Sequence, residues 1–367
     1  MLGPMVSGNG GFEPWAVLLA GGIGSRFWPA STPNRPKQFL PLASSQPLIR
    51  DTLERARAVA SPSNVLIVAG RHLEALIGEY LPDFARANLL IEPQARGTAA
   101  ALAWAAQEII SRSSNPERAV MIAMPSDHVI HPPNSFAATI KTAVEAAGRT
   151  GRLLTIGVPP SRPETGYGYI QVVKPASAPQ PQPTEVFEVT RFVEKPDLAT
   201  AQDYVADGEH FWNSGIFVWR PHVLLDELTA HTPEIASEMH RLESGDTTGF
   251  FAAIPPNLTI DYGLLERSSN VAVVEAQFEW DDVGAWGALL RVRDTDPDGN
   301  LVVGDVEAYE CRDSVLWADD GPIVGWGLDK MIVARASGIT FVAPLEHAAD
   351  LKRLLDRLPD RLKLGDG

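Results

Sequence analysis

The segment from Ala16 to Arg26, with the sequence AVLLAGGIGSR, constrains the fold of this chain more than any other stretch. Ala16 to Ala20 is a short apolar run of the kind found in a fully buried parallel strand. It leads directly into a turn that contains Gly21, Gly22 and Gly24. Glycine lets a backbone turn tightly and approach a ligand closely. The segment therefore predicts a central strand that ends in a tight, ligand-accessible loop.

Positive charge accompanies this loop. Consecutive backbone N–H groups in such a turn form a concave anion site, and Arg26 adds a charged fork. Lys37 follows Pro36 and brings an ammonium group. We interpret the segment as a site for a nucleoside triphosphate; the competing interpretation is a tight strand-to-helix turn with a surface arginine. A Walker A loop would need Gly where Arg26 stands, and the dinucleotide motif would need Gly where Phe27 stands.

The composition bounds the class of protein. The chain has 367 residues, a formal net charge of −15 and 45% hydrophobic residues, which allows a large core and a second, smaller domain. The acidic balance argues against a nucleic-acid partner, because such a partner needs a basic face. One cysteine, Cys311, excludes internal disulfides and suits a reducing compartment. No run reaches the roughly 18 apolar residues of a membrane span, so we expect no membrane contact and a cytoplasmic location.

Strand-like apolar runs alternate with helix-like stretches through the first half of the chain. Strands are expected at 65–69, 88–91, 119–124 and 153–158, and helices at 47–60, 71–80, 98–111 and 135–147. This alternation is typical of βαβ units with helices on both faces of a sheet. We expect a doubly wound, mostly parallel α/β fold whose ligands bind beyond the carboxyl ends of the strands.

The sequence texture changes after about position 297. Short β runs separated by glycines are expected at 301–306, 314–317, 322–325, 330–334 and 339–342, followed by an amphipathic helix over 346–358. We therefore expect a large domain at 14–297 and a small β-rich unit at 298–367. Residues 1–13 are Gly-rich and lack a basic start and an apolar stretch, so we expect a flexible tail rather than a signal peptide.

Asp127 is a candidate metal ligand. It follows the apolar run 119–124 directly, and a carboxylate at the carboxyl end of a central strand faces the ligand crevice. Mg²⁺ takes carboxylate and phosphate oxygens, so Asp127 could bind the ion that accompanies a triphosphate. The competing interpretation is a helix N-cap, a common role for aspartate.

Several motifs together resemble those of the sugar-1-phosphate nucleotidyltransferases. The motif L-A-G-G-x-G-S-R at 19–26 is followed by P-K-Q-F-L-P at 36–41. The F-W-P and K-Q-F-L-P details are similar to the bacterial mannose-1-phosphate guanylyltransferase branch rather than to the thymidylyl- and uridylyltransferases. P-S-D-H around Asp127 and W-D-D-V-G at 280–284 extend the resemblance, which covers roughly residues 17–291.

This resemblance implies a Rossmann-like nucleotidyltransferase domain with a left-handed β-helix-like tail. It implies that Asp127 and Asp282 bind Mg²⁺ and that Arg26 and Lys37 face the triphosphate, these four being the catalytic residues. Without the resemblance, Asp282 would be part of an acidic turn. The nucleotide-binding residues that it implies are Leu19, Ala20, Gly21, Gly22, Gly24, Ser25, Arg26, Glu92, Gly97, Thr98 and Asp127.

Three further segments match the part of the family pattern that holds the sugar phosphate. Gly168 lies in G-Y-G-Y-I, where glycines allow close approach to a hydroxylated ligand. Glu194 could accept hydrogen bonds from sugar hydroxyls, and Lys195 could neutralise the phosphate. Asn213 can donate and accept at once. Taken singly, the Glu-Lys pair also fits a surface ion pair, and the W-N-S-G segment fits a turn.

One segment departs from the family pattern. The family commonly has R-N-T-A-P after the third strand, whereas this chain has Arg96, Gly97, Thr98, Ala99 and Ala100. This loop is implied to hold the nucleobase together with Glu92. Glycine in place of asparagine removes a side-chain amide, which leaves the selectivity for the base open.

The resemblance implies transfer of GMP from GTP to α-D-mannose 1-phosphate, by in-line attack on the α-phosphorus, giving GDP-mannose and pyrophosphate. The nearest alternative is the same chemistry with UTP or dTTP and glucose 1-phosphate. A second alternative is a non-catalytic homologue that binds a nucleotide sugar and regulates a partner enzyme. The implied partners are the two small-molecule substrates, and the expected assembly is a homodimer.

Overall fold

The computed structural model describes residues 11–22, 24–173 and 186–363, so most of the expected tail at 1–13 lies outside the described residues. The chain divides into two compact units. The first unit comprises Met1–Ala20, Leu53–Pro125 and Ile130–Trp280, and the second comprises Gly21–Thr52, Ser126–Val129 and Asp281–Gly367.

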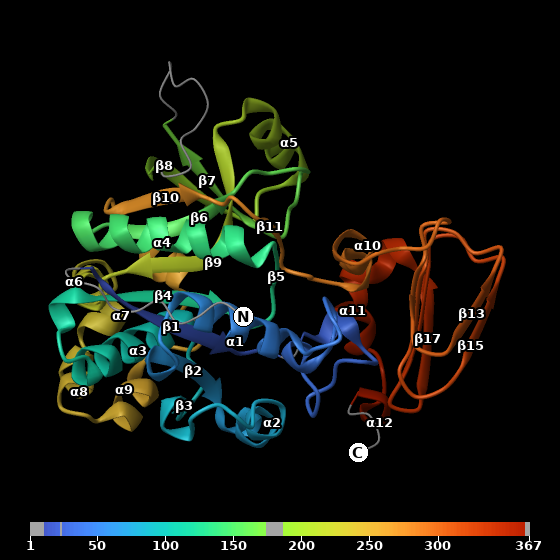
Figure 1. Cartoon of the computed structure of the whole chain (residues 1–367), viewed down its shortest axis with the longest axis horizontal. Helices are drawn as coiled ribbons and strands as arrows, with labels where there is room; N and C mark the ends of the chain where they lie inside the picture. Colours follow the sequence, from blue (N-terminus) through green and yellow to red (C-terminus); the bar gives the residue numbers. More distant parts are fainter. Residues whose placement is uncertain (1–10, 23, 174–185, 364–367) are drawn as a thin grey trace. The chain divides into compact units, whose positions relative to one another are not determined.

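The first unit is an α/β structure (Figure 1). Its strands are β1 (Glu13–Ala20), β2 (Val65–Gly70), β3 (Leu89–Glu92), β4 (Ala119–Pro125), β6 (Leu153–Val158), β7 (Gly168–Val172), β8 (Val186–Glu194), β9 (His210–Trp219) and β10 (Val271–Glu275). Its helices are α2 (Glu74–Tyr80), α3 (Thr98–Arg112), α4 (Pro133–Thr150), α5 (Leu198–Asp207), α6 (Pro221–His231), α7 (Pro233–Ala236), α8 (Met239–Glu243) and α9 (Thr247–Ala253). Residues of α1 (Leu48–Val59), β5 (Val129–His131) and β11 (Glu279–Asp281) belong to both units.

The nine strands of the first unit form one sheet in the order β3-β2-β1-β4-β9-β6-β10-β8-β7. The segment from β3 to β4 is parallel, and β6 and β10 are also parallel. In contrast, β9 runs antiparallel to β4 and β6, and β7 and β8 pair antiparallel. The expected α/β fold is confirmed, but the sheet is mixed rather than mostly parallel. A buried apolar run has the same pattern in either direction, so the sequence could not give the strand polarity.

The core of the first unit is built on the alternation of side chains along the strands. Trp15 and Val17 of β1 point to the face that carries α3, where residues 99–106 are all buried. Six of these eight are alanines, and their small side chains let α3 lie close against the sheet. Helix α4 packs outside this cluster against β4, β6, β9 and β10, so helices cover both faces of the sheet (Figure 1).

The second unit is rich in short strands. These are β12 (Leu301–Val303), β13 (Val306–Tyr309), β14 (Val315–Ala318), β15 (Ile323–Trp326), β16 (Met331–Ala336) and β17 (Ile339–Pro344), with α10 (Leu289–Val292), α11 (Leu351–Leu355) and α12 (Asp360–Lys363). Strands β12, β14 and β16 stack in parallel, as do β13 and β15. Because β17 pairs antiparallel with β16, the stack ends there. The described strands form no solenoid, so the expected left-handed β-helix is not confirmed.

Aromatic side chains form the core of the second unit. Trp286 contacts Phe27 and Trp317, with ring centroids 5.2 and 5.6 Å apart. Its indole N–H donates to the carbonyl oxygen of Trp28 at 3.1 Å. The expected helix over 346–358 is wrong in its extent. A 3₁₀ segment over Leu345–Asp350 precedes α11, which ends at Leu355.

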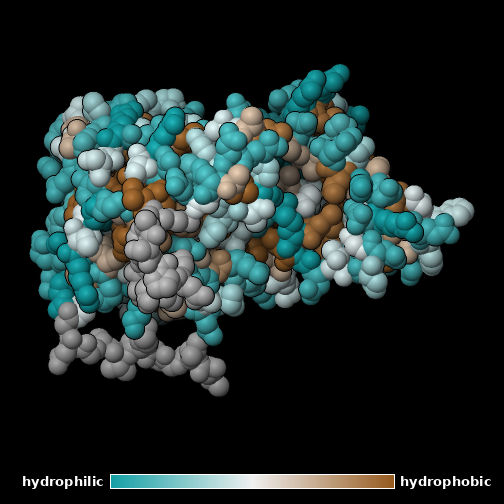
Figure 2. Space-filling model, turned by 90° about the horizontal axis from the view of Figure 1, so that it is seen from above, coloured by the Kyte–Doolittle hydropathy of each residue, from teal (hydrophilic) through white to brown (hydrophobic). Residues whose placement is uncertain are grey.

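The surface seen in Figure 2 is mostly hydrophilic, with hydrophobic residues in separate small groups. The exposed large apolar side chains include Val324 and Trp326 of β15. Within residues 11–22, 24–173 and 186–363, no helix has both the length and the hydropathy that a bilayer crossing requires.

Replacing Phe251 of α9 with alanine is expected to cost about 3–5 kcal/mol in the free energy of unfolding, because the ring is fully buried and packs edge-on against Trp104 of α3. The matched control is Leu198→Ala at the start of α5, where the side chain is 54% exposed and the expected cost is below about 0.5 kcal/mol. Urea denaturation followed by circular dichroism measures both. Equal losses in the two variants would contradict this account of the core.

Candidate active site

The glycine loop follows β1 immediately and belongs to the second unit from Gly21 onward. Gly22 and Gly24 have φ values of +85° and +67°, which glycine adopts without steric cost. A Cβ on Gly24 would lie 2.2 Å from the Cβ of Lys37. Gly24 must therefore be glycine both for its backbone conformation and because Lys37 packs against it. The sequence suggested close approach to a ligand, whereas the residue that closely approaches Gly24 is Lys37.

Lys37 links the two predicted metal ligands. Its Nζ donates to Oδ2 of Asp127 at 2.9 Å and to the main-chain oxygen of Asp282 at 2.5 Å. The lysine side chain is only 7% exposed, whereas that of Asp127 is 28% exposed. The structure thus brings Asp127 and Asp282 to one ammonium group within the second unit. Asp127 precedes β5 and caps no helix, because α4 begins at Pro133, so the competing N-cap interpretation is wrong.

The charge of Asp127 is stabilised by its neighbours. Burial by itself would raise the pKa of this carboxyl, but the Lys37 ammonium and His128 outweigh burial and hold the pKa below its usual value. Asp127 is therefore ionised throughout the neutral range. An ionised, partly exposed carboxylate is what a divalent cation requires of a ligand.

The turn that carries Asp282 is held in a strained conformation. Val283 has a φ of +48°, which is uncommon for a β-branched residue. Its N–H donates to Oδ1 of Asp281 at 2.8 Å, and Asp281 forms an ion pair with Arg291 at 2.8 Å. Asp281 is 5% exposed. Asp281 and Arg291 therefore hold this turn, a role that the sequence alone did not give to Asp281. Strained backbone of this kind clusters at functional sites.

Arg26 lies beside the same turn. Its guanidinium donates to the main-chain oxygen of Gly284 at 3.3 Å. A Cβ on Gly284 would lie 3.1 and 3.2 Å from the carboxylate oxygens of Asp282 and 3.4 Å from the Arg26 guanidinium. Gly284 thus leaves room for Arg26 and Asp282 to lie close together.

The donor set fits a magnesium ion that arrives with phosphate. Within residues 11–22, 24–173 and 186–363, no three His, Cys, Asp or Glu side chains converge in a way that could hold a metal. Mg²⁺ keeps several waters and binds through one or two carboxylates plus substrate phosphates. Asp127 and Asp282 would supply the one or two carboxylates that such an ion takes from a protein. A site built entirely from protein ligands would need more.

A second group of predicted residues lies in the first unit. The pairing of β7 with β8 places Gly168 opposite Glu194, and a Cβ on Gly168 would lie 2.5 Å from Oε2 of Glu194. The ammonium of Lys195 donates to Oε1 of Glu194 at 2.5 Å. The backbone N–H of Lys195 donates to the carbonyl oxygen of Tyr167 at 3.1 Å, and Lys195 has a φ of +50°. Gly168, Glu194 and Lys195 therefore form one polar cluster.

Asn213 of β9 extends this cluster to a residue that the sequence analysis missed. Its Nδ2 donates to Oδ1 of Asp261 at 2.8 Å. Burial and the charge of Glu194 raise the pKa of Asp261 to about 6, although Asn213 and Lys195 act in the opposite direction. Asp261 begins the π-helical turn η7 (Asp261–Leu265) and follows no predicted strand, so no strand-end pattern pointed to it. Its hydrogen bond to Asn213 joins residues that are far apart in the sequence, so only the fold reveals it.

The residues predicted to hold the base occupy the end of β3 and the start of α3. Glu92 closes β3, and burial raises the pKa of its carboxyl to about 7. Gly97 has a φ of +99°, and a Cβ there would lie 2.3 Å from the carbonyl oxygen of Leu258. The hydroxyl of Thr98 accepts a hydrogen bond from the N–H of Ile260 at 2.8 Å. Gly97 and Thr98 are therefore packed against the 258–260 segment, which explains in steric terms why position 97 has no side chain.

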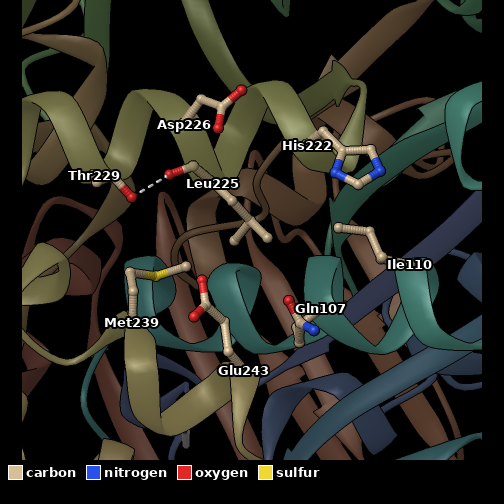
Figure 3. Close-up of a pocket in the computed structure, with 8 residues that line it drawn as sticks. All are labelled: Gln107, Ile110, His222, Leu225, Asp226, Thr229, Met239 and Glu243. Carbon is tan, nitrogen blue, oxygen red and sulfur yellow. Dashed lines mark hydrogen bonds between the residues drawn. The ribbon is translucent and has the colours of Figure 1, made fainter.

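A cavity of about 200 Å³ lies elsewhere in the first unit (Figure 3). Helices α3, α6 and α8 line it with Gln107, Ile110, His222, Leu225, Asp226, Thr229, Met239 and Glu243. The hydroxyl of Thr229 donates to the main-chain oxygen of Leu225 at 2.8 Å, which is an ordinary bond within a helix. None of the predicted site residues lines this cavity.

Comparison with known proteins identifies the class. The profile described as Nucleotidyl transferase matches residues 15–299. The chain therefore belongs to the nucleotidyl transferase family and is an enzyme of that kind.

Relatives narrow this assignment. A mannose-1-phosphate guanylyltransferase of Escherichia coli strain K12 is 33% identical over 357 residues, which cover 94% of this chain and 73% of the relative. The xanthan biosynthesis protein XanB of Xanthomonas campestris is 34% identical over 352 residues, which cover 93% of this chain and 72% of XanB. A crystal structure from Thermus thermophilus, described as a mannose-1-phosphate geranyltransferase, superimposes with a TM-score of 0.85 at 32% identity, covering 94% of this chain and 99% of that one. The resemblance that the motifs indicate is thus confirmed.

Lys37→Met should raise the pKa of Asp127, because burial then acts without the opposing ammonium, and should lower turnover about 100-fold or more. Carbon-13 NMR titration of the Asp127 carboxyl and an assay of pyrophosphate release measure the two effects. Lys141→Met on the exposed face of α4 is the control and should change neither. An unchanged pKa for Asp127 in the Lys37 variant would contradict the electrostatic role given to this lysine.

Proposed function

We propose that the protein transfers GMP from GTP to α-D-mannose 1-phosphate and releases pyrophosphate in a Mg²⁺-dependent reaction. The single observation that carries the proposal is the ammonium of Lys37, which hydrogen-bonds both Asp127 and Asp282. Relatives described as mannose-1-phosphate guanylyltransferases support the choice of GTP and mannose 1-phosphate.

On the nucleotide side, we assign the phosphates to the glycine loop, Arg26 and Lys37. Backbone N–H groups of the loop supply donors, and the two cations offset the charge of the triphosphate. Asp127 and Asp282 would hold Mg²⁺, which when bound withdraws charge from the phosphoryl oxygens. Lys37 orients the carboxylate of Asp127 and holds the main chain at Asp282, because it donates to an oxygen of each.

The nucleobase is assigned to Glu92, Gly97 and Thr98. An ionised carboxylate can accept from the N–H groups on the edge of guanine. Because the pKa of Glu92 is about 7, hydrogen bonds from these groups would shift its carboxyl towards the ionised form. The packing of Gly97 against Leu258 leaves only backbone groups at position 97. This departure from the family pattern is the specific observation that keeps UTP or dTTP, with glucose 1-phosphate, as the second candidate.

On the sugar side, we assign the hexose phosphate to Gly168, Glu194, Lys195 and Asn213. Lys195 would meet the phosphate, and the carboxylate of Glu194 would accept from sugar hydroxyls. The left-handed φ of Lys195 supports a functional role, because such conformations in non-glycine residues cost energy.

The chemistry needs no nucleophile from the protein. The ionised sugar phosphate attacks the α-phosphorus of the triphosphate in line, and pyrophosphate leaves. Positioning of the two reactants can supply about 7–11 kcal/mol of the barrier in favourable cases, and the cations supply the electrostatic part. We further propose that residues 14–297 form the catalytic domain, that 298–367 form an accessory β unit, and that two copies form a homodimer.

A substrate panel tests this function. GTP, ATP, UTP and dTTP are each combined with mannose 1-phosphate or glucose 1-phosphate, and pyrophosphate release is measured with and without Mg²⁺. GTP with mannose 1-phosphate should give the highest kcat/KM. Preference for UTP or dTTP with glucose 1-phosphate would overturn the choice of substrates, and binding without turnover under any metal would favour the regulatory homologue.

Two variants separate the roles of the two groups. Asp282→Asn should lower kcat by about 100-fold or more without a change in melting temperature, because the variant loses a charged oxygen that would hold Mg²⁺. Lys195→Ala should chiefly raise the KM for the sugar phosphate and leave the KM for the triphosphate unchanged. Near-normal turnover of the Asp282 variant in Mg²⁺ would remove the two-aspartate site.

A further inference from the structure

Asn213 is more fully engaged by the protein than its sequence motif suggests. Its Oδ1 accepts from the Thr155 hydroxyl at 3.0 Å and from the N–H of Gly215 at 3.2 Å. Its Nδ2 donates to Oδ1 of Asp261 at 2.8 Å. The orientation of the amide is fixed, because the Gly215 N–H can only donate and an ionised carboxylate can only accept.

This arrangement leaves Asn213 little to offer a ligand. An amide oxygen has two lone pairs and an amide nitrogen has two hydrogens. The N–H of Gly215 uses one lone pair of Asn213, and Asp261 uses one of its hydrogens. The Thr155 hydroxyl lies at the other lone pair and has the Ile216 carbonyl, at 3.3 Å, as a second acceptor for its single hydrogen. Asn213 therefore has limited capacity to accept from a sugar hydroxyl, and a stronger acceptor would come from another residue.

Asp261 is the acceptor that Asn213 holds in place. Asn213 and a backbone N–H both donate to this carboxylate, which can accept further bonds because an ionised carboxylate has about four lone-pair sites. The pairing of β7 with β9 sets Tyr169, next to Gly168, opposite Trp212, next to Asn213, and Asn213 bonds Asp261. The charges of Glu194 and Lys195 also act on Asp261, so it belongs to the same polar cluster. It also begins the π-helical turn η7, a rare conformation that is frequent at functional sites.

Glu194, by contrast, is tied to Lys195 at 2.5 Å. A hydrogen bond from a hydroxyl to a carboxylate is about twice as strong as one between neutral groups. A hexose offers several hydroxyls, each of which needs an acceptor when it leaves water. A second carboxylate beside the Glu194–Lys195 pair meets that need.

We infer that Asp261 is a further substrate-binding residue, whose carboxylate accepts a hydrogen bond from a hydroxyl of the hexose 1-phosphate while Asn213 acts as its positioning residue. This inference rests on the proposed function, because it takes a hexose 1-phosphate as the ligand of the cluster. It also makes Asp261 a determinant of specificity. A site built to bond a hydroxyl strongly rejects the analogue that lacks it, since the acceptor is then left unpaired.

The test measures KM and kcat for mannose 1-phosphate with the wild-type protein and Asp261→Asn. The variant keeps the shape of the side chain but presents an amide to the ligand. Its KM for the sugar phosphate should rise about 10- to 100-fold, with the KM for the triphosphate unchanged. Asp203→Asn, which makes the same change at an exposed aspartate of α5, is the matched control and should behave as the wild type. Melting temperatures of both variants check that they fold.

A series of deoxy sugar phosphates provides an independent measurement on the wild-type protein. Mannose 1-phosphate lacking the hydroxyl at carbon 2, 3, 4 or 6 is tested in turn. One analogue should lose as much on the wild type as mannose 1-phosphate loses on the Asp261 variant, and that analogue should show no further loss on the variant. Unequal, additive losses for all four analogues would overturn the inference.

Titration calorimetry with mannose 1-phosphate separates the two ways of failing. Equal affinity of the wild type and Asp261→Asn would overturn the role of Asp261 and leave the proposed function intact. A wild-type protein that neither binds nor consumes any hexose 1-phosphate would overturn the proposed function and this inference with it. Weaker binding by the variant alone supports the assignment.

Discussion

The geometry of the candidate phosphoryl site depends on one buried ammonium. A buried charge is costly unless it is paired and hydrogen-bonded, and Lys37 meets this condition through Asp127 and the main chain of Asp282. The same side chain requires glycine at position 24, because any Cβ there would overlap with it. Lys37, Asp127 and Asp282, which are far apart in the sequence, are thus joined by hydrogen bonds from one charged group. The strained turn at Val283, held by Asp281 and Arg291, presents Asp282 to this unit.

The cluster in the first unit follows a different principle, in which backbone pairing fixes the positions and side chains complete them. The register of β7 and β8 sets Gly168 against Glu194, and the bond from Lys195 to Tyr167 fixes the chain just beyond β8. Asn213 and Asp261 add a hydrogen-bonded pair to the same cluster. Because each polar group constrains the next, such a network is stiff and favours one arrangement of its members.

The sequence predicted the existence of elements better than their direction or their partners. The runs that became β2, β4 and β6 were located to within a residue or so, since a buried strand needs a continuous apolar run. The polarity of β9 and the interrupted helix after Leu345 depend on tertiary packing that no local pattern carries. The motifs indicated Asp127 and Asp282. They did not indicate Asp281 or Asp261, whose roles come from bonds to Arg291 and Asn213.

The close packing at Gly97 has a consequence for the exchange of segments among relatives. A Cβ at position 97 would overlap with the backbone of Leu258, whose N–H donates to the carbonyl oxygen of Arg96 and whose carbonyl oxygen accepts from the N–H of Ala99. An asparagine-containing loop grafted at 96–100 would collide with that backbone unless the 257–260 segment were transplanted with it. The two segments, about 160 positions apart, are therefore packed as one unit, and a chimera has to take both of them from the same parent.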